Sequence, residues 1–255
     1  MDTVLRIENI EKYYGNKSNL TKALDRISLE VEKGEFVGIM GPSGAGKTTL
    51  LNILATISLP TMGSVKIQGN EITKMKSNEL SDFRRKKLGF IFQEFNLVDT
   101  LNAKDNILLP LAVERISKVE MERRVLHAAQ LLNIEEILKR YPDELSVGQR
   151  QRIAAARALV VHPQVIFADE PTGSLDSKSA TELLNYLNTI NQVEKSTILL
   201  VTHDPYTASY CNRILFIKDG VIFSEVVRRG SRNEFFERVI DMQATIGGGG
   251  KVNAL

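Results

Sequence analysis

The sequence predicts an α/β fold: a mainly parallel β-sheet covered by helices, with an antiparallel β patch and a helical insertion. Three observations lead to this prediction. Short, wholly apolar runs typical of buried strands alternate with helical segments. Two other segments alternate apolar and polar residues, which is typical of strands with one face in water. A central stretch places apolar residues only at helical spacing.

The first strand–helix unit contains the most informative motif of the chain. Residues 36–40 (FVGIM) form an apolar strand, and residues 49–54 (TLLNIL) continue as a helix. Between them, residues 41–48 (GPSGAGKT) fit the pattern G-x-x-x-x-G-K-T. Glycines let successive backbone N–H groups turn toward phosphate oxygens, and a helix start adds unpaired N–H groups and partial positive charge. The sequence therefore predicts a binding site for a nucleoside triphosphate.

Two side chains of this phosphate loop have separate expected roles. Lys47 can reach the β- and γ-phosphates, and the hydroxyl of Thr48 can bind Mg²⁺. The expected nucleotide-binding residues of the loop are Gly41, Pro42, Ser43, Gly44, Ala45, Gly46, Lys47, Thr48 and Thr49.

Two segments of alternating polarity surround the phosphate-loop unit. In residues 26–32 (RISLEVE) and 64–68 (SVKIQ), every second side chain is apolar. We expect them to form an antiparallel patch beside the parallel strands.

A helical region follows the next apolar strand, residues 88–92, which ends at Gln93. Residues 121–132, for example, place apolar side chains at helical spacing between charges. We expect a helical subdomain at about residues 94–160.

This subdomain is expected to be inserted in a single domain over residues 1–242. A flexible tail is expected at residues 243–255, which contain a run of glycines.

A second nucleotide-binding element is predicted where residues 165–168 (VIFA), another buried strand, end in two acids. Ligands of open α/β folds bind at the carboxyl ends of the strands. There Asp169 would hold Mg²⁺, directly or through water. Glu170 would take a proton from an attacking water or polarise it. Residues 198–201 (ILLV) form one more buried strand, which again follows a helix.

Between these elements, residues 145–152 (LSVGQRQR) lead into an alanine-rich helix. Ser146 is a good N-cap, and Gln149 completes a capping-box pattern. Taken alone, this segment predicts only a well-capped helix.

The composition excludes several classes of protein. The net charge of +2 gives no reason to expect a nucleic-acid partner. Cys211 is the only cysteine, so no internal disulfide can form and a reducing compartment fits. No apolar run approaches the roughly 18 to 20 residues that span a bilayer, and the N-terminus lacks the apolar segment of a signal peptide. We therefore expect a cytoplasmic chain that reaches a membrane only through another subunit.

Over almost its whole length the sequence resembles the ATPase subunits of ABC transporters. GPSGAGKT resembles their Walker A loop, VIFADE their Walker B motif and LSVGQ their LSGGQ signature. Gln93 matches the Q-loop glutamine, and His203, in VTHD, matches the switch histidine. The D-loop matches Ser174, Leu175 and Asp176, and Tyr14 aligns with the aromatic residue that stacks on adenine, in preference to Tyr13.

The resemblance implies a P-loop NTPase fold of the ABC ATPase type, with ATP and Mg²⁺ as cofactors. It implies that Tyr14 stacks on the base and that Gln93 touches Mg²⁺ or the attacking water. His203 would hydrogen-bond the γ-phosphate beside the catalytic Glu170. The implied metal ligands are Thr48, Gln93 and Asp169.

The resemblance also implies a head-to-tail homodimer that depends on ATP. Its signature residues, Ser146, Val147, Gly148 and Gln149, would meet the γ-phosphate bound to the opposite subunit, as suits a helix N-terminus. Opening and closing of the dimer would drive a membrane permease. Val147 departs from the family, which has glycine there. An ordinary φ is expected near a first helical turn, so a Cβ is tolerable, and Val147 should tune affinity or rate without abolishing activity.

Several segments resemble one branch of the family, which serves macrolide-exporter and lipoprotein-release permeases. LVDTLNAKDNILLPL, DEPTGSLDSKSA and THDPYTASYCNRILFIKDG are most similar to the bacitracin and lantibiotic resistance ATPases of Gram-positive bacteria. The resemblance implies a permease with a large extracellular domain, a sensor histidine kinase as a further partner, and a place at the inner face of the cell membrane. An ATPase of a lipoprotein-release or cell-division permease would share every catalytic residue and remains an alternative. A soluble ABC ATPase of translation or DNA repair would need a second cassette or a long coiled-coil insertion, and this sequence has neither.

Overall fold

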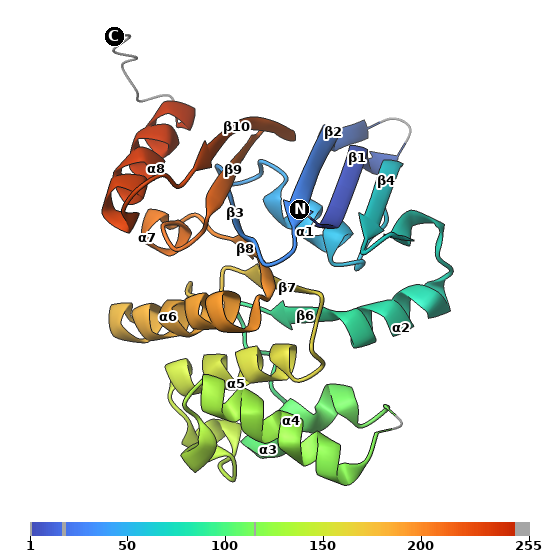
Figure 1. The fold of residues 1–255 in the computed structure, drawn as a ribbon. Helices are drawn as coiled ribbons and strands as arrows, with labels where there is room; N and C mark the ends of the chain where they lie inside the picture. Colours follow the sequence, from blue (N-terminus) through green and yellow to red (C-terminus); the bar gives the residue numbers. More distant parts are fainter. Residues whose placement is uncertain (1, 17–18, 115, 248–255) are drawn as a thin grey trace. The chain divides into compact units, whose positions relative to one another are not determined.

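The computed structural model describes residues 2–16, 19–114 and 116–247, and the chain divides into two compact units (Figure 1). The first unit combines Met1–Met75 with Leu199–Leu255, and the second is Lys76–Ile198. The second unit extends beyond the helical subdomain expected at about residues 94–160, because it also includes strands and helices on both sides of that segment.

The first unit contains a four-stranded antiparallel sheet in the order β2-β1-β4-β5. Its strands are β1 (Thr3–Asn16), β2 (Asn19–Glu32), β4 (Met62–Ile67) and β5 (Asn70–Glu71). Along β2, Ile27, Leu29 and Val31 are buried and their neighbours are not, which confirms the predicted alternation and the antiparallel patch.

A second set of strands in the first unit has the order β10-β9-β3-β8. These strands are β3 (Phe36–Met40), β8 (Thr197–Val201, whose last three residues belong to this unit), β9 (Arg213–Lys218) and β10 (Val221–Val227). Strand β3 runs parallel to β9, whereas β10 is antiparallel to β9. All of β3 is buried, as its apolar sequence predicted.

The helices of this unit are α1 (Lys47–Leu54), η1 (Ile72–Lys74), α7 (Pro205–Ala208) and α8 (Arg232–Ile246). The expected start of a flexible tail at residue 243 falls inside α8. The helix continues because the side chain of Ile246 is buried. The remainder of the expected tail, residues 248–255, lies outside the described residues.

The second unit combines two parallel strands with several helices. Strand β6 (Leu88–Ile91) pairs in parallel with β7 (Val165–Asp169). The helices are α2 (Ser77–Lys87), α3 (Ala103–Leu108), η2 (Leu109–Leu111), α4 (Lys118–Leu131), η3 (Glu135–Ile137), η4 (Pro142–Glu144), α5 (Val147–Leu159) and α6 (Ser177–Glu194). The helical texture predicted after β6 is therefore confirmed.

Helix α5 lies at the centre of this unit. It packs against α3 and α4 on one side and against β6 and α6 on the other (Figure 1). Its small side chains, Ala154, Ala155 and Ala156 among them, are fully buried and let these neighbours approach closely. In the part of the chain that the structure describes, no helix has both the length and the apolar composition to cross a bilayer.

Candidate functional site

The phosphate loop lies where β3 ends and α1 begins, as predicted. Gly46 caps α1 in the left-handed conformation, with φ 102° and ψ 3°. A Cβ at this position would lie 2.6 Å from the carbonyl oxygen of Ala23. Glycine is required here both for its backbone conformation and for the space that β2 leaves.

The loop already holds its lysine. The Nζ of Lys47 donates to the carbonyl oxygens of Gly41 and Pro42 at 2.9 and 2.8 Å. Thr48 is exposed in the first turn of α1, which contains no acidic residue. The helix start therefore presents partial positive charge and a hydroxyl oxygen to solvent, as a phosphate with its Mg²⁺ requires.

The structure separates the two neighbouring tyrosines of β1. The hydroxyl of Tyr13 donates to Glu11 at 2.7 Å, and the Nζ of Lys22 lies 5.4 Å from the centre of its ring. Tyr14 is 46% exposed, with the Nζ of Lys12 at 5.2 Å from its ring centre. The more accessible ring is thus that of Tyr14, the residue that the sequence favoured for stacking on a base.

His203 is exposed just beyond β8, in the same unit as the phosphate loop. The preceding residue, Thr202, donates its N–H to the carbonyl oxygen of Ile39 in β3 at 3.1 Å. Asp204 is the N-cap of α7 and accepts from the N–H groups of Tyr206 and Thr207 at 3.1 and 2.9 Å. The backbone on both sides of His203 is therefore fixed, and the residue itself is exposed.

The two acids lie at the carboxyl end of β7 in the second unit. Asp169 is the last residue of the strand, and its carboxylate is of the oxygen type that Mg²⁺ prefers. Glu170 adopts a left-handed φ of 44°, which is uncommon for a glutamate. Its carbonyl oxygen accepts from the N–H of Gly173 at 3.0 Å, so the chain turns sharply at this point.

Gln93 lies against this turn. A Cβ at Gly173 would be 3.1 Å from the Nε2 of Gln93, and the hydroxyl of Ser174 donates to the carbonyl oxygen of Gln93 at 3.0 Å. The structure therefore brings the predicted Q-loop glutamine next to the turn that carries Glu170 and to the first residue of the predicted D-loop.

The rest of the D-loop leads into α6. Leu175 donates its N–H to the carbonyl oxygen of Thr172 at 3.0 Å. Asp176 is the N-cap of α6 and accepts from the N–H groups of Lys178 and Ser179, both at 3.0 Å. The hydrogen bond from the backbone N–H of Ser179 has the largest effect on the pKa of Asp176, followed by the bond from the Ser179 hydroxyl. Both lower this pKa below its usual value. The carboxylate therefore stays ionised at the helix start.

The predicted capping box of α5 is confirmed. The hydroxyl of Ser146 accepts from the N–H of Gln149 at 3.2 Å, and the Oε1 of Gln149 accepts from the N–H of Ser146 at 2.9 Å. Val147 occupies the first helical position and is not among the residues with a positive φ. The expectation that a Cβ is tolerable there is confirmed. Ser146 and Val147 are both exposed, so the helix start is accessible to an anion.

One residue that the motifs did not single out connects several of them. Gln151 is fully buried in α5, and its Nε2 donates to the carbonyl oxygens of Phe92 and Pro171 at 3.0 and 2.7 Å. The available signal was a polar residue on the apolar face of an alanine-rich helix.

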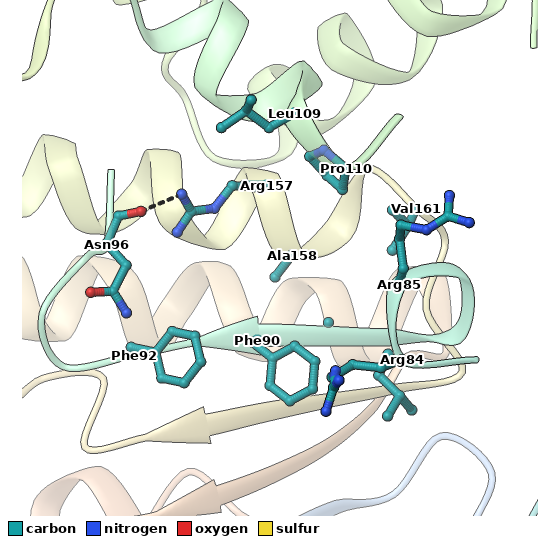
Figure 2. Close-up of a pocket in the computed structure, with 12 residues that line it drawn as sticks. Arg84, Arg85, Phe90, Phe92, Asn96, Leu109, Pro110, Arg157, Ala158 and Val161 are labelled. Carbon is teal, nitrogen blue, oxygen red and sulfur yellow. Dashed lines mark hydrogen bonds between the residues drawn. The ribbon is translucent and has the colours of Figure 1, made fainter. Parts of the chain in front are cut away.

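A groove of about 400 Å³ lies on the second unit (Figure 2). Phe90 of β6 and Phe92, just beyond the end of that strand, form one wall, with ring centres 5.9 Å apart. Leu109 and Pro110 lie above them, and Figure 2 shows Arg157 on α5 between the two walls. The remaining lining residues are Arg84, Arg85, Leu88, Gly89, Asn96, Ala158 and Val161.

Arg157 places a positive charge in this groove, whereas Arg85 is paired with Asp82 and Glu114. The guanidinium of Arg157 donates to the carbonyl oxygens of Asn96 and Phe95 at 2.6 and 2.7 Å, and these partners carry no charge. Burial lowers the pKa of Arg157, which means that the unneutralised charge is unfavourable in this position. The groove therefore combines aromatic side chains with the positive charge of Arg157.

Comparison with known proteins identifies a set of relatives. The family model described as ABC transporter matches residues 24–173. The bacitracin export ATP-binding protein BceA of Halalkalibacterium halodurans is 51% identical over 246 residues, which cover 96% of this chain and 97% of that protein. The macrolide export ATP-binding/permease protein MacB of Mannheimia succiniciproducens is 41% identical over 230 residues, which cover 90% of this chain and 36% of that protein.

A solved structure shows the same fold. The cassette MJ0796 of Methanocaldococcus jannaschii, in a dimeric post-hydrolysis state bound to ADP and Pi, has a TM-score of 0.80 and 38% identity. The match covers 89% of this chain and 100% of that chain.

Proposed function

The chain belongs to the ABC transporter family as an ATP-binding, ATP-hydrolysing subunit, and from this premise we propose that it powers a membrane permease for resistance to antimicrobial peptides of the bacitracin or lantibiotic type. The observation that carries the proposal is the 51% identity to a bacitracin export ATP-binding protein across 96% of this chain. Permeases of the lipoprotein-release or cell-division type remain the alternative, because they would use the same catalytic residues.

In the proposed mechanism, Lys47 and the backbone of residues 41–46 bind the phosphates of ATP, and Tyr14 stacks on the base. Mg²⁺ would be held by Thr48, Asp169 and Gln93, and it would offset the negative charge of the phosphates. The exposed hydroxyl at the start of α1 and the carboxylate at the end of β7 suit a hard cation.

The hydrolytic step needs a positioned water. Glu170 would accept its proton, and the His203 imidazole would hydrogen-bond the γ-phosphate. The turn closed between Glu170 and Gly173 and the fixed backbone around His203 support these roles, because catalysis requires side chains held on rigid supports.

We propose that two chains associate head to tail around ATP, as a relative does in a dimeric structure with ADP and Pi. The exposed start of α5, with Ser146 and Val147, would meet the γ-phosphate bound by the opposite chain. Unpaired N–H groups and partial positive charge at a helix start favour an anion there.

The groove between Phe90, Phe92 and Leu109 is the proposed contact with the permease. Its aromatic wall would bury the apolar face of a cytoplasmic permease segment, and the unneutralised charge of Arg157 would pair with a carboxylate on it. The chain would thus be held at the inner face of the cell membrane. The permease would carry a large extracellular domain and would work with a sensor histidine kinase.

Susceptibility of the source organism tests this proposal. A strain without this gene should become more sensitive to bacitracin or a lantibiotic, and wild-type protein should restore resistance whereas the Glu170→Gln variant should not. The exposed substitution Lys74→Ala should restore resistance fully and serves as the control. Unchanged peptide susceptibility, together with mislocalised lipoproteins or a division defect, would assign the chain to the alternative permeases.

A further inference from the structure

Gln151 has an unusual position for an uncharged polar residue. Its side chain is fully buried in α5, and both protons of its amide are used, one toward the carbonyl oxygen of Phe92 and one toward that of Pro171. Its Oε1 is buried and has no hydrogen-bond partner in the described part of the chain. An unpaired buried acceptor is destabilising, so what the amide contributes here is its two donors.

The two carbonyl groups belong to the ends of neighbouring strands. Ile91 of β6 pairs in parallel register with Ala168 of β7, and each strand then leads to one of the predicted catalytic residues. Phe92 directly precedes Gln93, and Pro171 directly follows Glu170. A single side chain therefore links the backbone beside both residues.

A second hydrogen bond also holds the backbone at the end of β6, and it comes from the D-loop. The hydroxyl of Ser174 donates to the carbonyl oxygen of Gln93 at 3.0 Å. The Q-loop backbone is thus attached to α5 at Phe92 and to the D-loop at Gln93.

We infer that Gln151 is a positioning residue for ATP hydrolysis, which fixes Gln93 and Glu170 relative to each other through the carbonyl oxygens of Phe92 and Pro171. This inference rests on the ATPase activity of the family and is independent of which permease the chain serves. Gln151 lies on the helix whose start carries Ser146. A shift of this helix when its start meets a phosphate would therefore also move the backbone beside Gln93 and Glu170. Small displacements of reacting groups reduce rates far more than they reduce binding.

The test is the substitution Gln151→Met, which keeps the length of the side chain and removes both donors. Steady-state ATP hydrolysis by the full chain should show kcat reduced about 10- to 100-fold, the scale expected for misplaced catalytic groups. The affinity for ATP in a fluorescence titration should stay within about twofold of the wild-type value, because Gln151 does not belong to the phosphate loop.

A matched control separates positioning from stability. Asn191 of α6 is also buried, and its Nδ2 donates to the carbonyl oxygen of Ser196 at 2.9 Å, away from the predicted catalytic residues. The Asn191→Leu variant should lose thermal stability with kcat per folded molecule unchanged. A folded Gln151→Met variant with wild-type kcat would overturn the inference, and so would an equal loss of kcat in both variants.

An exposed position provides a second route, should Gln151→Met not fold. Ser174 is exposed, and Ser174→Ala removes its hydrogen bond to the Q-loop backbone at Gln93. The inference requires kcat to fall with ATP affinity unchanged, since the Gln93 carbonyl then loses this hydrogen bond while the bond to Phe92 remains. Unchanged kcat in this variant would show that fixation of the Q-loop backbone does not limit hydrolysis and would overturn the inference as well.

Discussion

Gly148 of α5 lies directly against Ser179 of α6, and this contact joins the signature helix to the D-loop. A Cβ at Gly148 would be 2.8 Å from the hydroxyl oxygen of Ser179 and 2.9 Å from its Cβ. Ser179 cannot easily move away, because its hydroxyl donates to the carboxylate of Asp176 at 2.7 Å. The need for glycine at residue 148 therefore has a cause within this chain, apart from the contact with the opposite subunit's γ-phosphate that the resemblance implies.

The Gly148→Ala variant should be destabilised by about 1–3 kcal/mol, the usual cost of an overpacked contact. Its ATP hydrolysis should fall as α5 and α6 separate. Thermal unfolding and steady-state hydrolysis would measure the two effects. Val147→Ala is the control for the stability measurement alone, since Val147 is exposed and its backbone is ordinary. Adding Ser179→Gly to Gly148→Ala should recover part of the stability, and no recovery would mean that the contact with Ser179 is not the cause.

Replacing Lys47 with alanine should abolish measurable ATP binding. Each hydrogen bond to a charged group contributes about 1.5–3 kcal/mol, and Lys47 is the only lysine of the phosphate loop. Titration with a fluorescent ATP analogue would show the loss, and Lys74→Ala, at an exposed position of η1, should bind normally. Wild-type affinity in Lys47→Ala would contradict the assignment of the phosphate site.

Tyr14→Ala should weaken ATP binding by about 2- to 10-fold, because a stacking contact contributes about 0.5–1.5 kcal/mol. Tyr14→Phe keeps the ring and should bind as the wild type does. If Tyr13→Ala weakens binding and Tyr14→Ala does not, the base stacks on the other tyrosine.

Ser146→Ala should leave ATP binding by the monomer intact and weaken ATP-dependent dimerisation, measured by size exclusion. Loss of the N-cap alone costs about 1 kcal/mol of stability, and a second serine cap controls for it. Ser117 caps α4 through the N–H of Glu120 at 3.2 Å, so Ser117→Ala should lose similar stability without affecting dimerisation. Equal dimerisation of Ser146→Ala and the wild type would exclude the contact in trans.

The sequence predicted most strands of this fold because their polarity patterns are regular. Strands β1, β5, β9 and β10 were not predicted. In β1, register shifts between Ile7 and Ile10 and the left-handed φ of 50° at Asn9 interrupt the alternation. The end of α8 was also missed, because a glycine run directly follows the buried Ile246 and suggested an earlier tail.

Within the candidate site, the motifs predicted which residue types belong together but could not predict contacts that depend on packing. The pairing of Gly148 with Ser179 requires α5 and α6 to lie side by side, and neither residue indicates the other in the sequence. The link from Gln151 to Phe92 and Pro171 uses backbone carbonyls, which leave no signature in the sequence.

ATP hydrolysis by Glu170→Gln is the most direct measurement of the central claim, which is that the acid at the end of β7 serves as the general base of an ATPase. The variant keeps the size of the side chain and removes its basicity, so kcat should fall by about 100-fold or more. It should still bind ATP and should accumulate as an ATP-bound dimer in size exclusion. A wild-type rate in Glu170→Gln would remove Glu170 from the mechanism and contradict the account.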